Sequence, residues 1–202
     1  TVDAVNFAPL VAGNTASLAF NGTTAYATVP DGANLEVGDD SFTVTAWIRP
    51  STVAGNKRIV NKWDNTVSFG WYLDLEGTTF RFRARDTAGR DSNFTYGSAI
   101  AANVWSFVAA RFDAERKQMM VFLNGVQIGG IGNANAASDD LSSAAVLGLG
   151  TIPSVPGNWY AGNIDEVKLW RVALSNEEIR AMTTGVDSFS SAVRLTTSAI
   201  PG

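Results

Sequence analysis

The sequence predicts an all-β protein in which two antiparallel sheets pack as a sandwich, with one short helix near the C-terminus. Three observations predict this fold class. Short runs rich in Val, Ile, Thr and aromatic residues alternate with Gly, Asn, Asp and Pro. Helical periodicity is nearly absent outside one segment. The 202 residues, 46% hydrophobic and 17% charged, suit one globular domain with a single core.

Twelve segments have the composition of strands, and this number is too large for one ordinary sheet. They are residues 17–20, 25–29, 42–49, 58–63, 71–75, 79–85, 93–98, 105–112, 118–123, 126–129, 145–149 and 162–171. The clearest reversal is Asn124-Gly125, because a two-residue type I′ turn needs positive φ at both positions. Glu76-Gly77 and the polar stretch 86–91 predict two further turns. The glycines at 129–132 precede no helix and are expected to form a loop.

One helix is predicted to begin at Ser175, whose hydroxyl can cap it while Glu178 reaches back in a capping box. The helix is expected to end near Gly185. Residues 186–202 are rich in Ser and Thr and predict either an extra edge strand or the start of a linker. We therefore expect a single domain over residues 1–202, with its core at about 16–183.

The composition excludes several classes of function. There is no Cys and no His, which removes disulfides, thiolate metal sites, Ser-His-Asp and Cys-His nucleophiles and imidazole bases. A net charge of −4 without a Lys/Arg run argues against a nucleic-acid partner. No stretch approaches the ~20 apolar residues of a membrane-spanning helix, and Thr1 does not begin a signal peptide, so we expect a mature module without membrane insertion.

Six motifs in order carry a resemblance to a known family. They are SLAFNGT (17–23), FTVTAWIRP (42–50), IVNK (59–62), WSFVA (105–109), VFLNG (121–125) and GNIDEVKLW (162–170), followed by ALS (173–175). Together they resemble the laminin-G-like, concanavalin A-like jelly roll of pentraxin type over about residues 16–183. The resemblance implies a secreted or cell-surface carbohydrate-binding or adhesion module of a larger protein, frequently with calcium. The same sandwich also carries glycoside hydrolases and polysaccharide lyases.

Asp165 is a candidate calcium ligand. It shares strand parity with Val167 and Leu169, so its carboxylate is expected on an inward face, where a charge needs partners. A structural Ca²⁺ ion completed by backbone carbonyls and Asn21 would supply them. The alternatives are hydrogen bonds from backbone N–H groups, or a bulge that shifts the parity.

Asp64-Asn65 resembles the acid–amide calcium pair of pentraxins. The acidic cluster that completes the pentraxin site would fall near residues 150–152, where this chain has no carboxylate. The alternative is therefore a turn formed by Asp64 and Asn65.

A hairpin of alternating charges is the main candidate for a ligand-binding face. Tyr72, Asp74 and Glu76 share one face of their strand, and Arg81, Arg83 and Arg85 lie opposite an apolar face of the next. The plain interpretation is cross-strand ion pairing on a solvated sheet. The functional interpretation is a sugar- or uronate-binding face where Arg makes bidentate contacts and Tyr72 stacks. Asp74 and Glu76 do not complete the carboxylate motif of laminarinase-like enzymes, so no catalytic residue is predicted.

Aromatic residues near turns are the other ligand-binding candidates. Trp63 and Trp159 are flanked by turn residues and can stack on sugar rings, and Lys62 and Asn158 can add polar contacts. The remaining tryptophans, Trp47, Trp105 and Trp170, are expected to be structural.

The sequence thus predicts a non-catalytic extracellular module that binds a glycan or another cell-surface ligand. The predicted ligand-binding residues are Trp63, Asp64, Tyr72, Asp74, Arg81, Arg83, Asn158 and Trp159. A protein-recognition or structural domain of a larger secreted protein is the alternative, and an enzyme of the same fold is a third possibility. An enzyme would need two close carboxylates in a groove.

Overall fold

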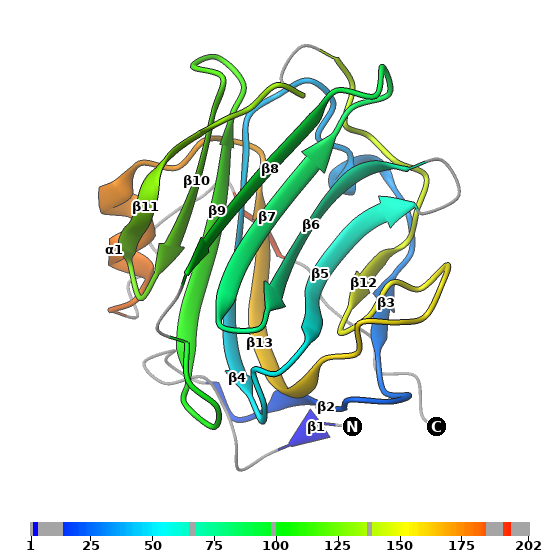
Figure 1. The fold of residues 1–202 in the computed structure, drawn as a ribbon, viewed down its shortest axis with the longest axis vertical. Helices are drawn as coiled ribbons and strands as arrows, with labels where there is room; N and C mark the ends of the chain where they lie inside the picture. Colours follow the sequence, from blue (N-terminus) through cyan, green and yellow to red (C-terminus); the bar gives the residue numbers. More distant parts are fainter. Residues whose placement is uncertain are drawn as a thin grey trace.

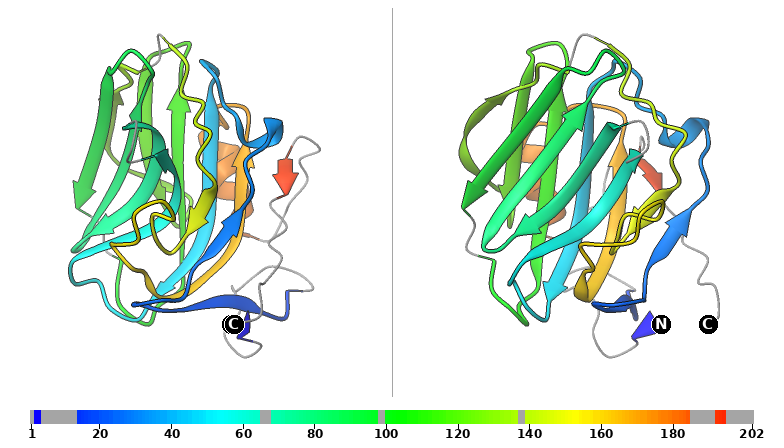
Figure 2. Two further views of the ribbon diagram at one scale, coloured as in Figure 1. Left: turned by 90° about the vertical axis from the view of Figure 1, so that its right-hand side faces the viewer. Right: turned by 45° about the vertical axis from the view of Figure 1, so that its right-hand side comes forward.

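The computed structural model describes residues 2–3, 14–64, 68–97, 100–136, 139–184 and 192–194. Two antiparallel sheets stack face to face, as Figure 1 shows from the front and Figure 2 from the side. The predicted two-sheet jelly-roll sandwich with one short C-terminal helix is confirmed. In the described ranges, no helix has the length and apolar character needed to cross a membrane.

The rear sheet in Figure 1 has eight strands in the order β1-β2-β13-β4-β9-β10-β11, with β14 also paired to β13. Their bounds are β1 Val2–Asp3, β2 Ser17–Asn21, β4 Phe42–Pro50, β9 Ser106–Asp113, β10 Gln118–Leu123, β11 Val126–Asn133, β13 Ala161–Trp170 and β14 Ala192–Arg194. β14 matches the edge-strand alternative for the tail. The single-domain assignment stays a prediction.

The front sheet has six strands in the order β3-β12-β5-β6-β7-β8. Their bounds are β3 Ala27–Val29, β5 Asn56–Asp64, β6 Phe69–Glu76, β7 Thr79–Arg85, β8 Asp91–Gly97 and β12 Leu147–Leu149. A short 3₁₀ helix, Ala33–Leu35, precedes β4. Neighbours β5 to β8 follow one another in sequence, so their register is set by short turns.

The core lies between the sheets and is built from alternate residues of each strand. Phe42 of β4 lies within it, with its ring centroid 5.3 Å from that of Trp71 and 5.8 Å from that of Phe82 on the front sheet. The ring of Phe112 on β9 lies 5.4 Å away on the rear sheet. These aromatic contacts join the two layers, and each ring removes a large apolar area from water.

The predicted hairpin between β10 and β11 is confirmed. Asn124 and Gly125 both have positive φ, 50° and 78°, and Leu123 pairs with Val126 across the turn. β11 continues to Asn133, through the glycines that were expected to form a loop. That expectation was wrong because the segment pairs with β10, where Met119 lies opposite Gly132. The glycines leave room for the rings of Phe94 and Tyr96, since a Cβ at Gly132 would lie 2.2 Å from Phe94 Cδ2.

The predicted helix is α1, Asn176–Met182, which lies on the side of the rear sheet away from the front sheet (Figure 2). Ser175 and Glu178 form both halves of the capping box. The helix ends at Met182, three residues before the predicted end at Gly185, which lies outside the described residues. Ile179 and Met182 pack with outward-facing apolar residues of the rear sheet, so this outer face is covered.

Candidate functional site

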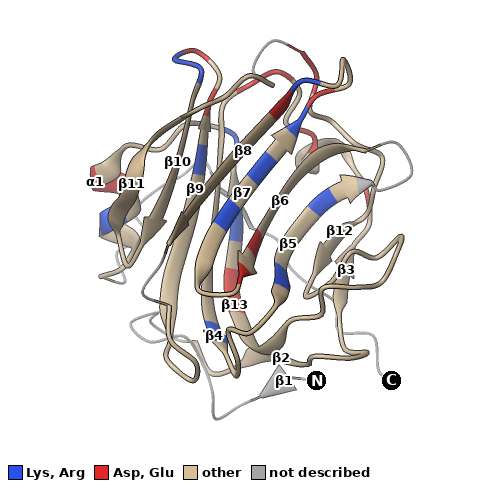
Figure 3. Cartoon of the chain, in the orientation of Figure 1, with Lys and Arg blue, Asp and Glu red and all other residues tan. Residues whose placement is uncertain are grey.

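The outer face of the front sheet carries the predicted charge hairpin. Burial alternates along β7 and places Arg81, Arg83 and Arg85 opposite the buried Phe80, Phe82 and Ala84, as predicted. Cα pairing aligns Asp74 with Arg81 and Tyr72 with Arg83. We call the following residues the polar face: Arg58, Asn61, Trp63, Tyr72, Asp74, Glu76, Arg81, Arg83, Asp91, Asn93 and Thr95. Figure 3 shows basic residues along β7, with acidic residues on β6 and at the start of β8.

Asp74 is the buried centre of the polar face. Its side chain is fully buried, and it accepts two hydrogen bonds from Arg81, at 2.9 Å from Nε and 2.7 Å from Nη2. Arg58 Nη1 lies 3.0 Å from the same carboxylate. Burial raises the pKa of Asp74, and the hydrogen bond from Arg81 is the main influence that opposes this shift. A bidentate fork of this kind fixes the position of Arg81.

Tyr72 and Trp63, the residues of this face that were predicted to stack on a sugar, lie beneath guanidinium groups. The Arg58 guanidinium carbon is 3.5 Å from the Tyr72 ring centroid, and the Arg83 guanidinium carbon is 5.0 Å from the Trp63 ring centroid. Tyr72 and Trp63 are only 4% and 5% exposed. Because its ring is buried under Arg58, Tyr72 supports the face and does not offer a stacking surface in this structure.

Among the arginines that form ion pairs on this face, Arg83 has the most exposed side chain. Its Nε lies 2.9 Å from Asp91 Oδ1, its Nη2 donates to Asp91 Oδ2, and its Nη1 lies 3.5 Å from the Tyr72 hydroxyl. The hydrogen bond to Asp91 raises the pKa of Arg83. On β8, Asn93 pairs with Arg83 of β7 and Thr95 pairs with Arg81. Both β8 residues are exposed and extend the polar face to the sheet edge.

Five residues of the polar face were missed from the sequence: Arg58, Asn61, Asp91, Asn93 and Thr95. Arg58 lies at the predicted start of its strand, and the parity there is broken by a register shift between Arg58 and Val60. Asp91 was assigned to a turn although it begins β8. Pairing β8 antiparallel to β7 would have aligned Asn93 and Thr95 with the arginines, and that is the signal that the sequence offered.

Asn158 and Trp159 lie in the loop between β12 and β13, away from Trp63. The exposed Asn158 has φ of 52°, and its carbonyl accepts a hydrogen bond from the Arg58 backbone at 2.8 Å. Trp159 is half-buried, and its ring centroid lies 6.1 Å from that of the exposed Tyr26. The structure therefore places these two predicted residues at the β3 side of the front sheet, with Tyr26 as a further aromatic neighbour.

The predicted inward placement of Asp165 was wrong. A register shift between Asp165 and Lys168, with Glu166 at φ 46°, changes the parity of β13, and Asp165 pairs with Trp47, whose side chain packs in the outer apolar cluster. The Asp165 carboxylate accepts hydrogen bonds from Asn14 Nδ2 at 2.7 Å and from the Glu166 backbone at 2.8 Å. The bulge that was the alternative interpretation is therefore present.

Asn21 does not meet Asp165. Asn21 Oδ1 accepts hydrogen bonds from the backbone of Thr23, Thr24 and Ala25 and so shapes a turn. It pairs with Ala161, which is four residues, about 13 Å, from Asp165 along the strand. Among the described residues, no group of three acidic side chains is placed to hold a metal ion. The side chain of Asp64 lies outside the description, and calcium stays a prediction.

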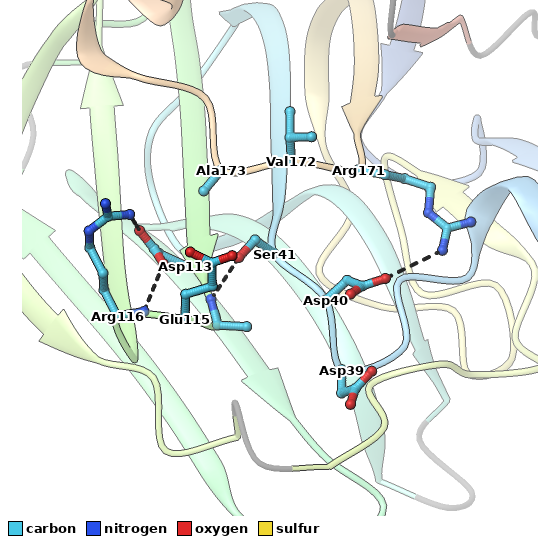
Figure 4. Close-up of a pocket in the computed structure, with 10 residues that line it drawn as sticks. Asp39, Asp40, Ser41, Asp113, Glu115, Arg116, Arg171, Val172 and Ala173 are labelled. Atoms are coloured by element: carbon cyan, nitrogen blue, oxygen red, sulfur yellow. Dashed lines mark hydrogen bonds and ion pairs between the residues drawn. The ribbon is translucent and has the colours of Figure 1, made fainter.

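A hollow of about 400 Å³ lies at one end of the sandwich (Figure 4). Two of its acidic residues are engaged by arginines: Asp113 pairs with Arg116 at 3.0 Å, and Asp40 lies 3.9 Å from Arg171. On the polar face, Asp74 and Glu76 are both tied to Arg81, and Asp74 is out of reach of solvent. The carboxylates of the polar face are therefore not the free acid–base pair of a glycosidase.

Comparison with known proteins agrees with the fold. A sequence profile of the concanavalin A-like lectin/glucanases superfamily matches residues 21–180. The chain belongs to this superfamily. The N,N-dimethylformamidase beta subunit of Paracoccus aminophilus is 25% identical over 184 residues, which are 80% of this chain and 24% of that protein. The chain thus spans about a quarter of the length of this curated relative.

Similar solved structures include carbohydrate-binding domains. The botulinum neurotoxin serotype D ligand-binding domain, in complex with N-acetylneuraminic acid, matches 92% of this chain and 46% of its own, with a TM-score of 0.69 and 16% identity. The CBM40 of Ruminococcus gnavus IT-sialidase, bound to α2,3-sialyllactose, matches 83% of this chain and 95% of its own, with a TM-score of 0.62 and 17% identity. At these identities the likeness shows the fold.

Proposed function

We propose that this chain is a non-catalytic carbohydrate-binding domain that holds an oligosaccharide on the polar face. The observation that carries the proposal is the arrangement of Arg81 and Arg83, whose guanidinium groups are each fixed by a carboxylate before any ligand arrives. Fixed donors and acceptors lose little conformational freedom on binding and are suited to the fixed directions of sugar hydroxyls.

The rest of the structure supports this choice of face. The outer face of the rear sheet is covered by α1, whereas the polar face ends in the exposed side chains of Asn93 and Thr95. Several similar structures are carbohydrate-binding domains. We place the domain in a larger, secreted or cell-surface protein, as the resemblance implies. The ion pairs of Asp74 and Glu76 with Arg81 favour binding over catalysis.

A glycan array followed by calorimetric titration of the best glycan tests the proposal. Arg83→Ala removes the most open guanidinium and is expected to weaken binding at least about tenfold, since hydrogen bonds to charged groups contribute ~1.5–3 kcal/mol. Arg116→Ala is the matched control, because Arg116 is an exposed arginine whose ion pair lies at the β9–β10 turn. The proposal fails when no glycan binds, or when both variants bind like the original protein.

A protein-recognition domain is the second candidate. Tyr96 of β8 and Val126 and Ile131 of β11 are exposed apolar residues on two neighbouring edge strands. The dimethylformamidase relative is four times longer than the matched segment, which suits a domain that contacts other parts of a large protein. An empty glycan array, together with protection of residues 126–133 from hydrogen exchange in the longer protein, would favour this function.

A further inference from the structure

The guanidinium groups of the polar face are already bound by carboxylates. Arg81 uses all three side-chain nitrogens: Nε and Nη2 bind Asp74, and Nη1 lies 3.0 Å from Glu76 Oε2. Arg58 Nη1 lies 3.0 Å from Asp74 Oδ2, the oxygen that also binds Arg81 Nη2. An acidic sugar that approached Arg81 would therefore have to displace a carboxylate that the chain itself supplies.

Arg83 is held by Asp91 in the same way. Asp91 binds both Nε and Nη2, which is the fork that an arginine offers to any carboxylate. The Cα of Asp91 is paired with Arg85, so its side chain reaches diagonally to Arg83. Arg85 donates from Nε to the Gly89 carbonyl at 3.3 Å, in the adjoining turn. Asp91 thus occupies the position that the carboxylate of an acidic sugar would need.

The outermost charges of these pairs are negative. Glu76 is 46% exposed and its partner Arg81 is 15% exposed, while Asp91 is 37% exposed and Arg83 is 30% exposed. Within these pairs, three guanidiniums, of Arg58, Arg81 and Arg83, balance three carboxylates, of Asp74, Glu76 and Asp91. A ligand at these pairs thus meets balanced charge whose more exposed members would repel an anion.

From this geometry we infer that the polar face selects uncharged oligosaccharides and rejects those bearing a carboxylate, with Asp91 as the residue that determines this specificity. The inference rests on the proposed function. Sugar hydroxyls donate to the exposed oxygens of Asp91 and Glu76 and accept hydrogen bonds from Arg83, Asn93 and Thr95. A carboxylate has no hydrogen to donate and can gain the Arg83 fork only by removing Asp91.

The test compares two oligosaccharides that differ only by a terminal carboxylate-bearing sugar. Affinities are measured by calorimetry for the original protein, Asp91→Ala and Asp91→Asn. The original protein is expected to bind the uncharged glycan about tenfold or more tightly than the acidic one. Both variants free the Arg83 fork and should therefore bind the acidic glycan more tightly than the original protein does. Their preference for the uncharged glycan should fall by about tenfold or reverse.

Asp39→Ala is the matched control, because it removes the same charge from an exposed position outside the polar face. It is expected to keep the original preference. Tighter binding of the acidic glycan by the original protein would overturn the inference while leaving the proposed function intact. An unchanged preference in both Asp91 variants would also overturn it. If neither glycan binds and a wider array shows no binding, both the inference and the proposed function are overturned.

Discussion

Lys62 holds the front sheet to two distant segments through one buried ammonium group. Its Nζ lies 2.6 Å from Asp31 Oδ1, 2.9 Å from Glu36 Oε1 and 2.7 Å from the Ala145 carbonyl, and it also donates to the Ser143 carbonyl. The Lys62 side chain is 1% exposed. This lysine, considered from the sequence as a polar ligand contact, therefore joins β5 to the segments before β4 and β12.

We predict that Lys62→Met destabilises the fold by about 3 kcal/mol. Removal of one partner of a buried ion pair costs ~3–5 kcal/mol, because the other partner stays buried without compensation. Asp31 and Glu36 are 37% and 28% exposed and can be rehydrated, which places the cost at the lower end. Methionine keeps the apolar stem, so little packing is lost. For a domain of this size, the melting temperature should fall by roughly 6–12 °C.

Urea unfolding followed by tryptophan fluorescence and calorimetric melting provide the measurements. Lys57→Met is the matched control, because it makes the same substitution on the same strand at a partly exposed position. The control is expected to change the free energy of unfolding by less than about 0.5 kcal/mol. A Lys62→Met protein within about 1 kcal/mol of this control would refute the structural role assigned to the four oxygens.

Three further predictions concern the backbone, the helix and the pH response. Gly70→Ala should lower the free energy of unfolding by at least about 2 kcal/mol in a thermal melt, because φ at Gly70 is 112° and a Cβ would lie 2.2 Å from the Lys62 carbonyl. Gly97→Ala is the control and should be near neutral, because a Cβ there meets no atom within 4 Å. Ser175→Ala should cost about 1 kcal/mol in urea unfolding, and Ser175→Asp should restore most of it. The hydrogen bond from Lys62 is the main cause that lowers the pKa of Asp31. The stability that this hydrogen bond contributes is therefore complete above the ordinary pKa of Asp31, 3.8, and is lost as the pH falls through the lower pKa of the folded state. The difference in urea midpoint between the original protein and Asp31→Asn should therefore be present at pH 7 and disappear in strong acid; a difference independent of pH would contradict this assignment.

The charge hairpin was predictable because it depends only on local rules. Strand parity assigned Tyr72, Asp74 and Glu76 to one face, and the short turn at Gly77 brought that face against the arginines of the next strand. The capping box at Ser175 and the turn at Asn124 were predictable for the same reason, since each requires residue types at fixed short spacings.

Burial on the polar face was not predictable, because it depends on the exact register between strands. Arg58 covers Tyr72 only after β5 pairs with β6, and a register shift at Ile59 sets which way Arg58 points. The inward face predicted for Asp165 from strand parity was wrong for a related reason. A bulge inserts a residue without a clear sequence signal, and every later side chain on the strand then changes face.

The two outer faces of the sandwich differ in a way that decides where a ligand can bind. On the rear sheet, the outward residues of β9 and β10 include the apolar Phe107 and Phe122, and such a surface needs a cover. The segment from Leu174 through α1 supplies that cover, and the capping box stabilises the start of the helix. On the front sheet, the carboxylates of Asp74, Glu76 and Asp91 lie against arginines within β5 to β8. The face that remains accessible is therefore the one whose donors and acceptors are already fixed, and this is why we assign ligand binding to the front sheet.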